Sequence, residues 1–439
     1  MEAVLHDLFC DDYLATPTTI MKLLPKIFTV FLLLAATFIH AQDISQHIVP
    51  NRTNNKKQEK KPYVILISAD GFRYDLADKY RAQNLIALRN KGVQAAYMLP
   101  CYPSLTFPNH YSIATGLYPA HHGLVDNSFY DKNKNSSYSI GKQKAVRDSS
   151  WYGGVPLWVL AEKNQMLSAS FYWVGSEAAI GGVRPTYYYT YNEKIKIDDR
   201  LQVVKNWLQL PENKRPHFIT FYFPEVDHAE HMYGVDSKQT EEAVHFIDKS
   251  VAKLNAMIDS LHLKVNFIFV SDHGMANIDT SHTLSMPGVI DTSKFIIEGG
   301  GVLLHLYAKD TNDILPTYNK LKAEAKNFDV YLAANVPSKW HYRKVDDKYD
   351  RIGDIILVPH FPKVFQLSKR RPVPGVHGYD NYIKEMRATF YAWGPAFKKH
   401  KKIGGFENIN IYPLIAEILK LDYTNKIDGR LSVLKQILR

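Results

Sequence analysis

Residues 63–71 read YVILISADG, a near-continuous apolar run that ends in an acid and a glycine. Two later runs have the same form, HFITFYF (217–223) and VNFIFVS (265–271). Each is of strand length and rich in β-branched and aromatic residues, which is typical of strands buried on both faces. Such strands occur in parallel sheets that helices cover, so the three runs predict strands of one such sheet.

Helical patterns lie between these runs. The segment LADKYRAQNLIALRNKG (76–92) predicts a helix capped by Gly92, and residues 240–262 predict a second helix. Strands that alternate with helices predict an α/β fold with a doubly wound, mostly parallel sheet flanked by helices. The stretch from about 280 to 370 has the order strand–helix–strand–strand instead, which predicts a small α+β cap inserted into the larger domain.

The composition is that of an ordinary globular protein. Of the 439 residues, 46% are hydrophobic and 22% charged, which excludes a disordered chain, a collagen and a multi-span membrane protein. The two cysteines, Cys10 and Cys101, exclude a disulfide framework. The net charge of +10 is spread along the chain without a zinc-finger or basic-zipper pattern, so we expect no stable nucleic-acid complex.

Residues 21–41, MKLLPKIFTVFLLLAATFIHA, have the three parts of a secretory signal peptide. Lys22 and Lys26 form the positive start, residues 27–39 the apolar stretch, and Ala41 is the small residue at the cleavage point. We therefore expect an exported protein of bacterial type, periplasmic or secreted, with no membrane span in the mature chain. An uncleaved membrane anchor is the alternative.

The signal also divides the chain. Residues 1–20 do not fit upstream of it, and we expect translation to start at Met21. Residues 42–61 are polar and lack periodicity, so they are predicted to form a flexible linker. The main domain is then predicted at 62–439, and the sequence indicates no oligomeric state.

An acid follows each of the three apolar runs. Asp70 and Asp272 come at the ends of the first and third runs, and Asp227 follows the second by four residues. Ligands of open parallel sheets bind at the carboxyl ends of the strands, so the three acids can converge on one site. Three unpaired carboxylates close together repel one another, so cations are needed there. For any one acid alone, a turn or helix cap is the alternative.

Histidines accompany these acids. His273 follows Asp272 directly, and His231 lies four residues after Asp227, on the same side of a helical segment. His377 lies in GVHGYDN (375–381), where glycines allow a close backbone approach. Histidine with aspartate and no cysteine suits a catalytic type of zinc site, and manganese and iron are alternatives. We assign no role to His228.

The candidate nucleophile lies in LPCYPSLTFPNHYSIATG (99–116). Pro108 is predicted to be the first residue of a helix that Gly116 caps. Thr106 then lies just ahead of the helix N-terminus, where the helix dipole and free N–H groups stabilise negative charge. A hydroxyl held there beside a metal can ionise and attack phosphorus. The alternative is that Thr106 only caps the helix.

Together these motifs resemble the nucleotide pyrophosphatase/phosphodiesterase family of the alkaline phosphatase superfamily. The resemblance runs from about residue 62 to the C-terminal DGRLSVLKQIL, and its motifs are ISADGFR, PSLTFPNHYSIATGLYPAHHG, VDNSFYD, PEVDHAEHMYG, VSDHGM and VHGYDN. It implies an alkaline-phosphatase-like α/β fold in which residues 62–439 form a phosphodiesterase domain with two Zn²⁺ ions.

The resemblance also assigns roles to residues. One zinc would be held by Asp70, Thr106, Asp272 and His273, and the other by Asp227, His231 and His377. Thr106 would be the nucleophile and form a covalent nucleotidyl-threonine. Asn127 would stabilise the oxyanion together with the backbone N–H of Thr106.

For the nucleotide base, the resemblance implies stacking on aromatic side chains, for which we select Phe107 and Tyr188, with Tyr187 as the alternative. The segment 171–192 that holds these tyrosines is absent from lysophospholipase-like members and argues against a lipid substrate. The implied reaction releases nucleoside 5′-monophosphates from nucleotide pyrophosphates or phosphodiesters. Another superfamily hydrolase, such as a phosphomonoesterase, a phosphonate hydrolase or a phospholipid diesterase, is the alternative.

Two positions depart from known patterns. Val226 and Glu230 stand where the family usually has proline and glycine, so the loop and the charge near the metal ligands differ. The sequence from Cys101 to Leu105 is close to the sulfatase signature, but that signature requires arginine at the position of Leu105. A sulfatase is therefore not expected.

Overall fold

The computed structural model describes residues 44–367 and 371–439, so the predicted signal peptide at 21–41 lies outside the described residues. The three apolar runs form β2 (Tyr63–Ala69), β9 (Phe218–Phe223) and β10 (Val265–Val270). They are adjacent and parallel, with β2 in the middle. Every residue of β2 and β10 is buried, which explains why neither strand shows an alternation of polar and apolar residues.

Further strands extend this sheet on both sides to the order β1-β8-β7-β9-β2-β10-β17-β3-β18. The added strands are β1 (His47–Ile48), β3 (Val93–Ala95), β7 (Ser168–Phe171), β8 (Tyr187–Tyr189), β17 (Phe390–Trp393) and β18 (Lys401–Ile403). The pairs β1/β8, β10/β17 and β17/β3 are antiparallel and the other pairs are parallel. The predicted mostly parallel sheet is therefore confirmed.

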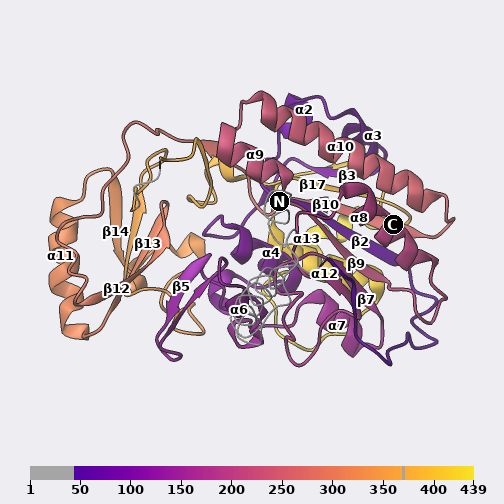
Figure 1. Cartoon of the computed structure of the whole chain (residues 1–439), viewed down its shortest axis with the longest axis horizontal. Helices are drawn as coiled ribbons and strands as arrows, with labels where there is room; N and C mark the ends of the chain where they lie inside the picture. The colour runs from indigo at the N-terminus through magenta and orange to yellow at the C-terminus, as the bar shows by residue number, and fades with distance from the viewer. Residues whose placement is uncertain (1–43, 368–370) are drawn as a thin grey trace, which may run out of the picture. The chain divides into compact units, whose positions relative to one another are not determined.

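Helices cover both faces of this sheet (Figure 1). Val64 and Leu66 of β2 belong to one hydrophobic core, and Ile65 and Ile67 to another, because successive side chains of a strand point to opposite faces. The first core includes residues of α4 (Thr106–Thr115), α7 (Leu157–Lys163) and α12 (Ile411–Leu419). The second includes residues of α3 (Gln83–Lys91), α8 (Ile197–Gln209) and α10 (Lys238–Asp259).

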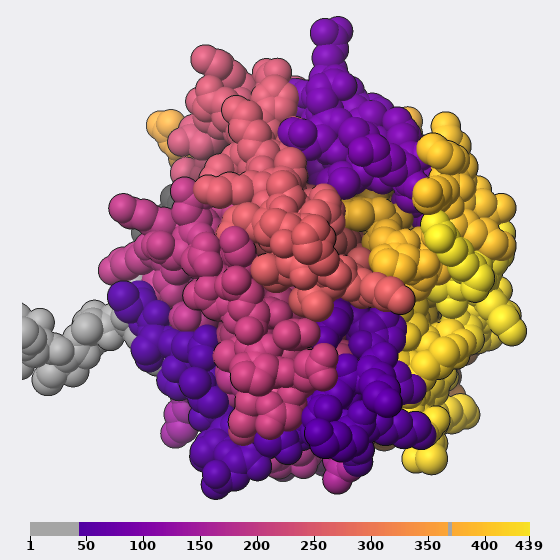
Figure 2. Space-filling model, turned by 90° about the vertical axis from the view of Figure 1, so that its right-hand side faces the viewer, coloured from indigo at the N-terminus to yellow at the C-terminus, as the bar shows by residue number. Residues whose placement is uncertain are grey.

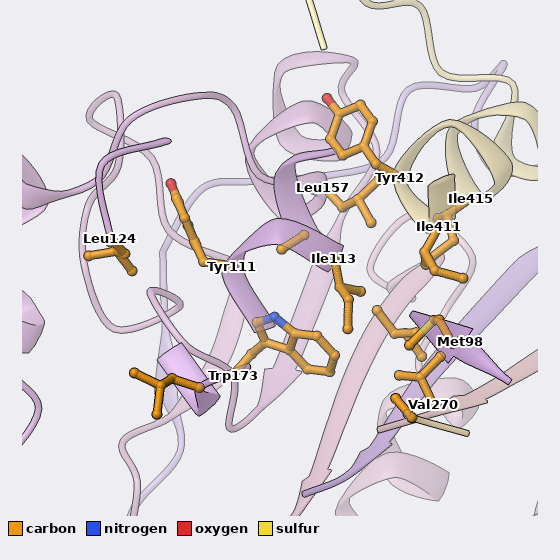
Figure 3. Close-up of a cluster of buried hydrophobic side chains, with 14 of the residues drawn as sticks. Met98, Tyr111, Ile113, Leu124, Leu157, Trp173, Val270, Ile411, Tyr412 and Ile415 are labelled. Atoms are coloured by element: carbon orange, nitrogen blue, oxygen red, sulfur yellow. The ribbon is translucent and has the colours of Figure 1, made fainter. Parts of the chain in front are cut away.

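Packing brings together segments that are distant along the chain. Figure 3 shows Ile113 of α4 and Ile411 of α12 beside Val270 of β10, three buried side chains of the first core. Figure 2 shows segments near the start of the described chain, in indigo, and near its end, in yellow, on the same face. In the described part of the chain, no helix is both long and apolar enough to cross a membrane.

The helix predicted over 76–92 is interrupted. It forms α2 (Leu76–Lys79) and α3, and between them Arg81 adopts a left-handed backbone conformation with φ +53°. Gly92 ends α3 at φ −115°, so it does not form the left-handed cap that the sequence predicts. A Cβ there would lie 2.2 Å from the carbonyl oxygen of Ala392, so this glycine is required by its contact with β17.

A second, four-stranded sheet forms between residues 295 and 359. Its order is β12-β13-β15-β14, all antiparallel, and it packs with one helix around a hydrophobic core of its own. The elements are β12 (Phe295–Gly300), β13 (Leu303–Ala308), α11 (Ile314–Glu324), β14 (Phe328–Leu332) and β15 (Ile355–Pro359). The order predicted from the sequence, strand–helix–strand–strand, lacks β12. This strand ends in two glycines and is only partly buried, so it does not form an apolar run.

The segment predicted to be a flexible linker at 42–61 is anchored over its described part. Residues of β1 pair with β8, and the Asn54 side chain is buried. Its Nδ2 donates to the carbonyl oxygens of Glu212 and Arg215, at 2.8 and 2.7 Å. The prediction is wrong here because the anchoring uses polar side chains and backbone groups, which leave no apolar periodicity.

Arg351 joins the second sheet to the hairpin of β5 (Ser128–Asp131) and β6 (Ser136–Ser139). Its guanidinium is buried, with Nε donating to Asp131 Oδ2 at 2.8 Å and an Nη donating to the carbonyl oxygens of Gly123 and Trp151. Removal of either member of a buried ion pair lowers the stability of the fold, because the other charge is left buried without a partner.

We predict that Arg351→Met lowers the free energy of unfolding by about 3–5 kcal/mol, because Asp131 is left buried without its counter-ion. Lys253→Met is the matched control: it breaks a surface pair with Asp198 and should cost at most about 1 kcal/mol. Urea denaturation of the two variants measures both values. Equal losses would show that the buried pair has no special role.

Candidate active site

The three predicted acids meet at the carboxyl edge of the central strands. Asp70 follows β2, Asp272 follows β10, and Asp227 lies in α9 (Glu225–Tyr233), the helix that follows β9. All three side chains are buried. They meet because β9, β2 and β10 are parallel neighbours whose carboxyl ends share one edge of the sheet.

The predicted histidines complete two groups of ligand atoms. Asp70, Asp272 and His273 form one group, and Asp227, His273 and His377 the other, each with its ligand atoms within 4.8 Å of one another. His273 Nε2 lies 3.0 Å from Asp272 Oδ2 and 3.4 Å from Asp70 Oδ1. The rings of His273 and His377 stack with their centroids 3.6 Å apart, so the two groups are contiguous.

His231 joins the second group from α9. Its Nε2 lies 3.4 Å from Oδ1 of Asp227, one helical turn earlier, as the spacing of four residues predicts. His377 Nε2 lies 3.7 Å from the same oxygen. A Cβ at Gly375 would lie 2.2 Å from the carbonyl oxygen of Glu230, so β16 (Gly375–Val376) can approach α9 only with glycine at that position.

The three histidines all present Nε2 to the acids. Their Nδ1–H groups donate to backbone carbonyl oxygens: His231 to Gly375 at 2.8 Å, His273 to Gly274 at 2.9 Å and His377 to Ser104 at 2.9 Å. A carbonyl only accepts, so Nδ1 carries a hydrogen, and in the neutral imidazole Nε2 has the lone pair. This is the arrangement by which proteins orient histidine ligands for a metal.

Carboxylate oxygens at the same place lack hydrogen bonds. Asp70 Oδ1, Asp227 Oδ1 and Asp272 Oδ2 are buried and accept none, although each lies near an imidazole Nε2. Lone pairs therefore face lone pairs, and a cation is the partner that satisfies both. The residues fit two divalent metal ions.

The electrostatics of the protein alone show the same need for positive charge. Burial, Asp272 and Asp227 raise the pKa of Asp70 well above its usual value. Burial also acts to raise the pKa of Asp227, but the positive charge of protonated His231 outweighs it and brings the pKa to about 2, and Asp227 in turn raises the pKa of His231. Burial and His273 lower the pKa of His377 to about 3, so this imidazole is neutral and available as a ligand.

Thr106 is the first residue of α4 and lies beside both groups. Its Oγ1 is 3.2 Å from His273 Nε2. The N-cap is Leu105, so Thr106 is not the capping residue. The helix begins two residues earlier than predicted, with Pro108 third, because proline fits anywhere in a first turn whose N–H groups have no helical partner. Gly116 caps α4 at φ +68°, as predicted.

Asn127 lies beside the nucleophile. Its Oδ1 accepts the backbone N–H of Phe107 at 3.1 Å, which orients the side-chain amide. The other end of that amide is an NH₂ group, a hydrogen-bond donor at the N-terminus of α4. The structure thus brings Asn127 to Thr106, as the sequence motif predicts.

A cavity of about 400 Å³ opens beside Thr106, Asp70 and Asp227. Its lining is rich in aromatic side chains, namely Phe107, Tyr172, Trp173, Tyr191 and Tyr222. Phe107 is therefore where the sequence prediction places it, next to the nucleophile. A planar ring can enter this cavity and meet aromatic faces.

Tyr188 is a correction to the sequence prediction, since it does not line this cavity. It lies in β8, where its ring stacks on His47 of β1 with centroids 4.8 Å apart, and Tyr187 is part of the hydrophobic core. Tyr191, just beyond the end of β8, lines the cavity and is 42% exposed. The acids were predicted from the residues that follow each strand. The same inspection of the residues that follow β8 would have found Tyr191.

Three residues near the site were not predicted. Tyr222 donates to Asp70 Oδ2 at 2.6 Å. His110 Nδ1 lies 3.2 Å from Asp272 Oδ2 and 3.0 Å from the carbonyl oxygen of Thr106, and its spacing of four from Thr106 was a usable signal. Glu230 is fully buried with both oxygens lacking hydrogen bonds, and burial and Asp227 raise its pKa well above the usual value.

The fold and the two ligand groups define an α/β protein with candidate metal positions at the carboxyl edge of its main sheet. The family described as type I phosphodiesterase / nucleotide pyrophosphatase matches residues 64–380. The chain belongs to this family, as the sequence motifs indicate.

Relatives support this membership. Venom phosphodiesterase 2 of Crotalus adamanteus is 34% identical over 370 residues, which cover 82% of this chain and 45% of that protein. An uncharacterized pyrophosphatase/phosphodiesterase of Schizosaccharomyces pombe is 32% identical over 397 residues, 85% of this chain and 80% of that protein. The chain thus spans less than half the length of the venom enzyme.

Solved structures show the same fold. Murine ectonucleotide pyrophosphatase/phosphodiesterase 5 superposes with a TM-score of 0.80 at 27% identity, covering 86% of this chain and 100% of that one. An inactive variant of that murine protein, in complex with AMP, superposes with the same TM-score at 26% identity and covers the same shares of the two chains.

We predict that a chelator lowers the melting temperature and that added Zn²⁺ restores it, because the buried acids repel one another without cations. Zinc at about 100 times its dissociation constant stabilises the native state by about 2.7 kcal/mol, roughly 3 °C for a domain of this size. Calorimetric scans with and without chelator measure the shift. His273→Ala, which removes one of the proposed ligands, should weaken the response to Zn²⁺, and an unchanged melting temperature of the unaltered chain in chelator would contradict the prediction.

Proposed function

We propose that the protein hydrolyses nucleotide pyrophosphates or phosphodiesters to nucleoside 5′-monophosphates, with Thr106 as the nucleophile and two Zn²⁺ ions as cofactors. The proposal is carried by one observation: Oγ1 of Thr106 lies at a helix N-terminus, 3.2 Å from His273 Nε2, beside buried carboxylate oxygens that accept no hydrogen bond. Membership of the family supports it.

Seven side chains would hold the two ions. Following the family motifs, one set is Asp70, Thr106, Asp272 and His273, and the other is Asp227, His231 and His377. When bound, the ions lower the pKa of a ligating hydroxyl and neutralise charge on phosphoryl oxygens. The orphaned oxygens and the shared orientation of the three imidazoles fit this role.

The chain's own residues then carry the reaction. Thr106 Oγ1 loses its proton and forms a bond to phosphorus while the bond from phosphorus to the leaving oxygen breaks, so the nucleotidyl group is left on Thr106 and the proton departs with the leaving oxygen. Water attacks the same phosphorus, releases the nucleoside monophosphate and returns a proton to Thr106. The backbone N–H of Thr106 and the NH₂ of Asn127, whose Oδ1 is held by the N–H of Phe107, would stabilise the added negative charge.

The cavity favours a diester over a monoester. No lysine or arginine is among the described residues that line it, so a phosphate dianion would find no cationic side chain there. Its aromatic walls suit a nucleoside, since a base stacked on an aromatic ring gains about 1–3 kcal/mol. The AMP bound to the murine relative agrees with a nucleotide ligand.

Export is part of the same proposal. Residues 21–41 would direct the chain out of the cytoplasm, and the names of the relatives, a venom enzyme and ectonucleotide enzymes, agree with this location.

The activity is tested by initial rates on two chromogenic substrates, the nitrophenyl ester of a nucleoside 5′-monophosphate and nitrophenyl phosphate. We expect kcat/KM for the diester to exceed that for the monoester by at least about 100-fold, because only the diester presents a nucleoside to the aromatic cavity and a single negative charge to the site. A preference for nitrophenyl phosphate would favour a phosphomonoesterase instead.

We predict that Thr106→Ala lowers kcat by about 10³-fold or more, because no other hydroxyl replaces the nucleophile. Zinc content, measured by atomic emission, should stay near two per chain, since six other ligands remain. Thr106→Ser is the matched control and should keep a substantial part of the activity. Retained turnover in Thr106→Ala would remove this residue from its proposed role.

A further inference from the structure

The cavity beside Thr106 carries two carboxylates at its aromatic end. Glu177 and Glu193 both line it, although the chain as a whole has a net charge of +10. Glu177 lies after the turn that holds Trp173, and Glu193 follows Tyr191 by two residues. Carboxylates in a pocket for a nucleoside repel any further anionic group of the ligand. Their presence therefore indicates a role in binding an uncharged or hydrogen-bond-donating part of it.

Glu177 is occupied by the protein itself. Its Oε1 accepts the backbone N–H of Tyr191 at 2.7 Å, and its Oε2 accepts Nε–H of Arg147, in α6 (Gln143–Arg147), at 2.9 Å. Its side chain is 11% exposed. Glu177 therefore fixes the segment that carries Tyr191, and its low exposure leaves a ligand little access to either oxygen.

Glu193 has a different environment. Its Oε1 accepts the hydroxyl of Tyr191 at 2.8 Å, and its Oε2 lies 3.4 Å from His228 Nδ1 of α9. The side chain is 49% exposed at the cavity, and each carboxylate oxygen can accept more than one hydrogen bond. Burial and Glu193 raise the pKa of Tyr191, so the hydroxyl remains a donor to the carboxylate.

These contacts place an acceptor at the edge of an aromatic ring. The hydroxyl of Tyr191 points to Glu193, so the carboxylate lies at the rim of that ring and not over its face. A base that stacks on the face of Tyr191 brings its own edge to the same rim. His228 holds the carboxylate from the opposite element, which limits its movement away from the cavity.

A carboxylate distinguishes bases by their hydrogen-bonding groups. It only accepts, and at position 4 of the pyrimidine ring cytosine presents an NH₂ donor where uracil and thymine present an oxygen acceptor. At position 6 of the purine ring adenine and guanine differ in the same way. We infer that Glu193 selects nucleotides whose base carries this amino group, and disfavours those with an oxo group in its place. The inference rests on the proposed function and specifies its substrate class.

The experiment compares nitrophenyl esters of cytidine and uridine 5′-monophosphate, which differ only at positions 4 and 3 of the same ring: cytidine has an amino group beside a bare nitrogen, and uridine has an oxo group beside an N–H. For the unaltered chain we expect kcat/KM for the cytidine ester to be about tenfold higher, the value of one hydrogen bond to a charged group. In Glu193→Gln the ratio should fall to near one, because an amide offers both a donor and an acceptor.

Glu177→Gln is the matched control. Its carboxylate oxygens are already bonded within the protein, so the cytidine-to-uridine ratio should stay near that of the unaltered chain even if the overall rate falls. A diester without a base, bis(nitrophenyl) phosphate, should be cleaved at the same rate by the unaltered chain and by Glu193→Gln, which shows that the reacting groups are undisturbed.

Equal kcat/KM values for the two esters in the unaltered chain would overturn the inference while leaving the phosphodiesterase proposal intact. A ratio that survives in Glu193→Gln but is lost in Glu177→Gln would also overturn it, and would assign the selection to Glu177. Absence of turnover on either ester and on bis(nitrophenyl) phosphate would instead overturn the proposed function itself.

Discussion

The mutual repulsion of Asp70, Asp227 and Asp272 is the constraint on which the site depends. Three carboxylates are buried at one edge of a sheet, and several of their oxygens accept no hydrogen bond from the protein. Burial without a partner is costly for any polar group and most costly for a charge. The Nε2 atoms of three histidines face the same acids, and two cations between them would supply the missing positive charge.

The architecture accounts for how these groups are held. Parallel strands deliver the acids to one edge, and α9 adds His231 one turn after Asp227. Backbone carbonyls fix the three imidazoles, so each ligand is oriented by the main chain and not by another mobile side chain. The close approach at Gly375 is what allows His377 to reach Asp227 from a distant part of the chain.

The cavity joins two chemical environments within one space. Near Thr106 it is polar and suited to a phosphoryl group, and away from it the walls are aromatic with acceptors at the rim. The loop after β8 controls this second part, because it carries both Tyr191 and Glu193 and is fixed by Glu177. In the proposed function, selectivity and catalysis reside on different elements, and we expect substitutions in that loop to change one without the other.

Local sequence was sufficient for the central strands, the acids that follow them, the pairing of Asp227 with His231 and the family motifs, because these depend on burial and on spacing along a single element. It was insufficient to predict that Tyr188 lies outside the cavity, that the described part of the segment at 42–61 is anchored, or that α4 begins at Thr106. Which tyrosine faces the cavity depends on where β8 ends and on its pairing with β1, and Asn54 is anchored by carbonyl groups some 160 residues away. Contacts between distant segments leave no periodic trace in the sequence, so only the tertiary structure decides them.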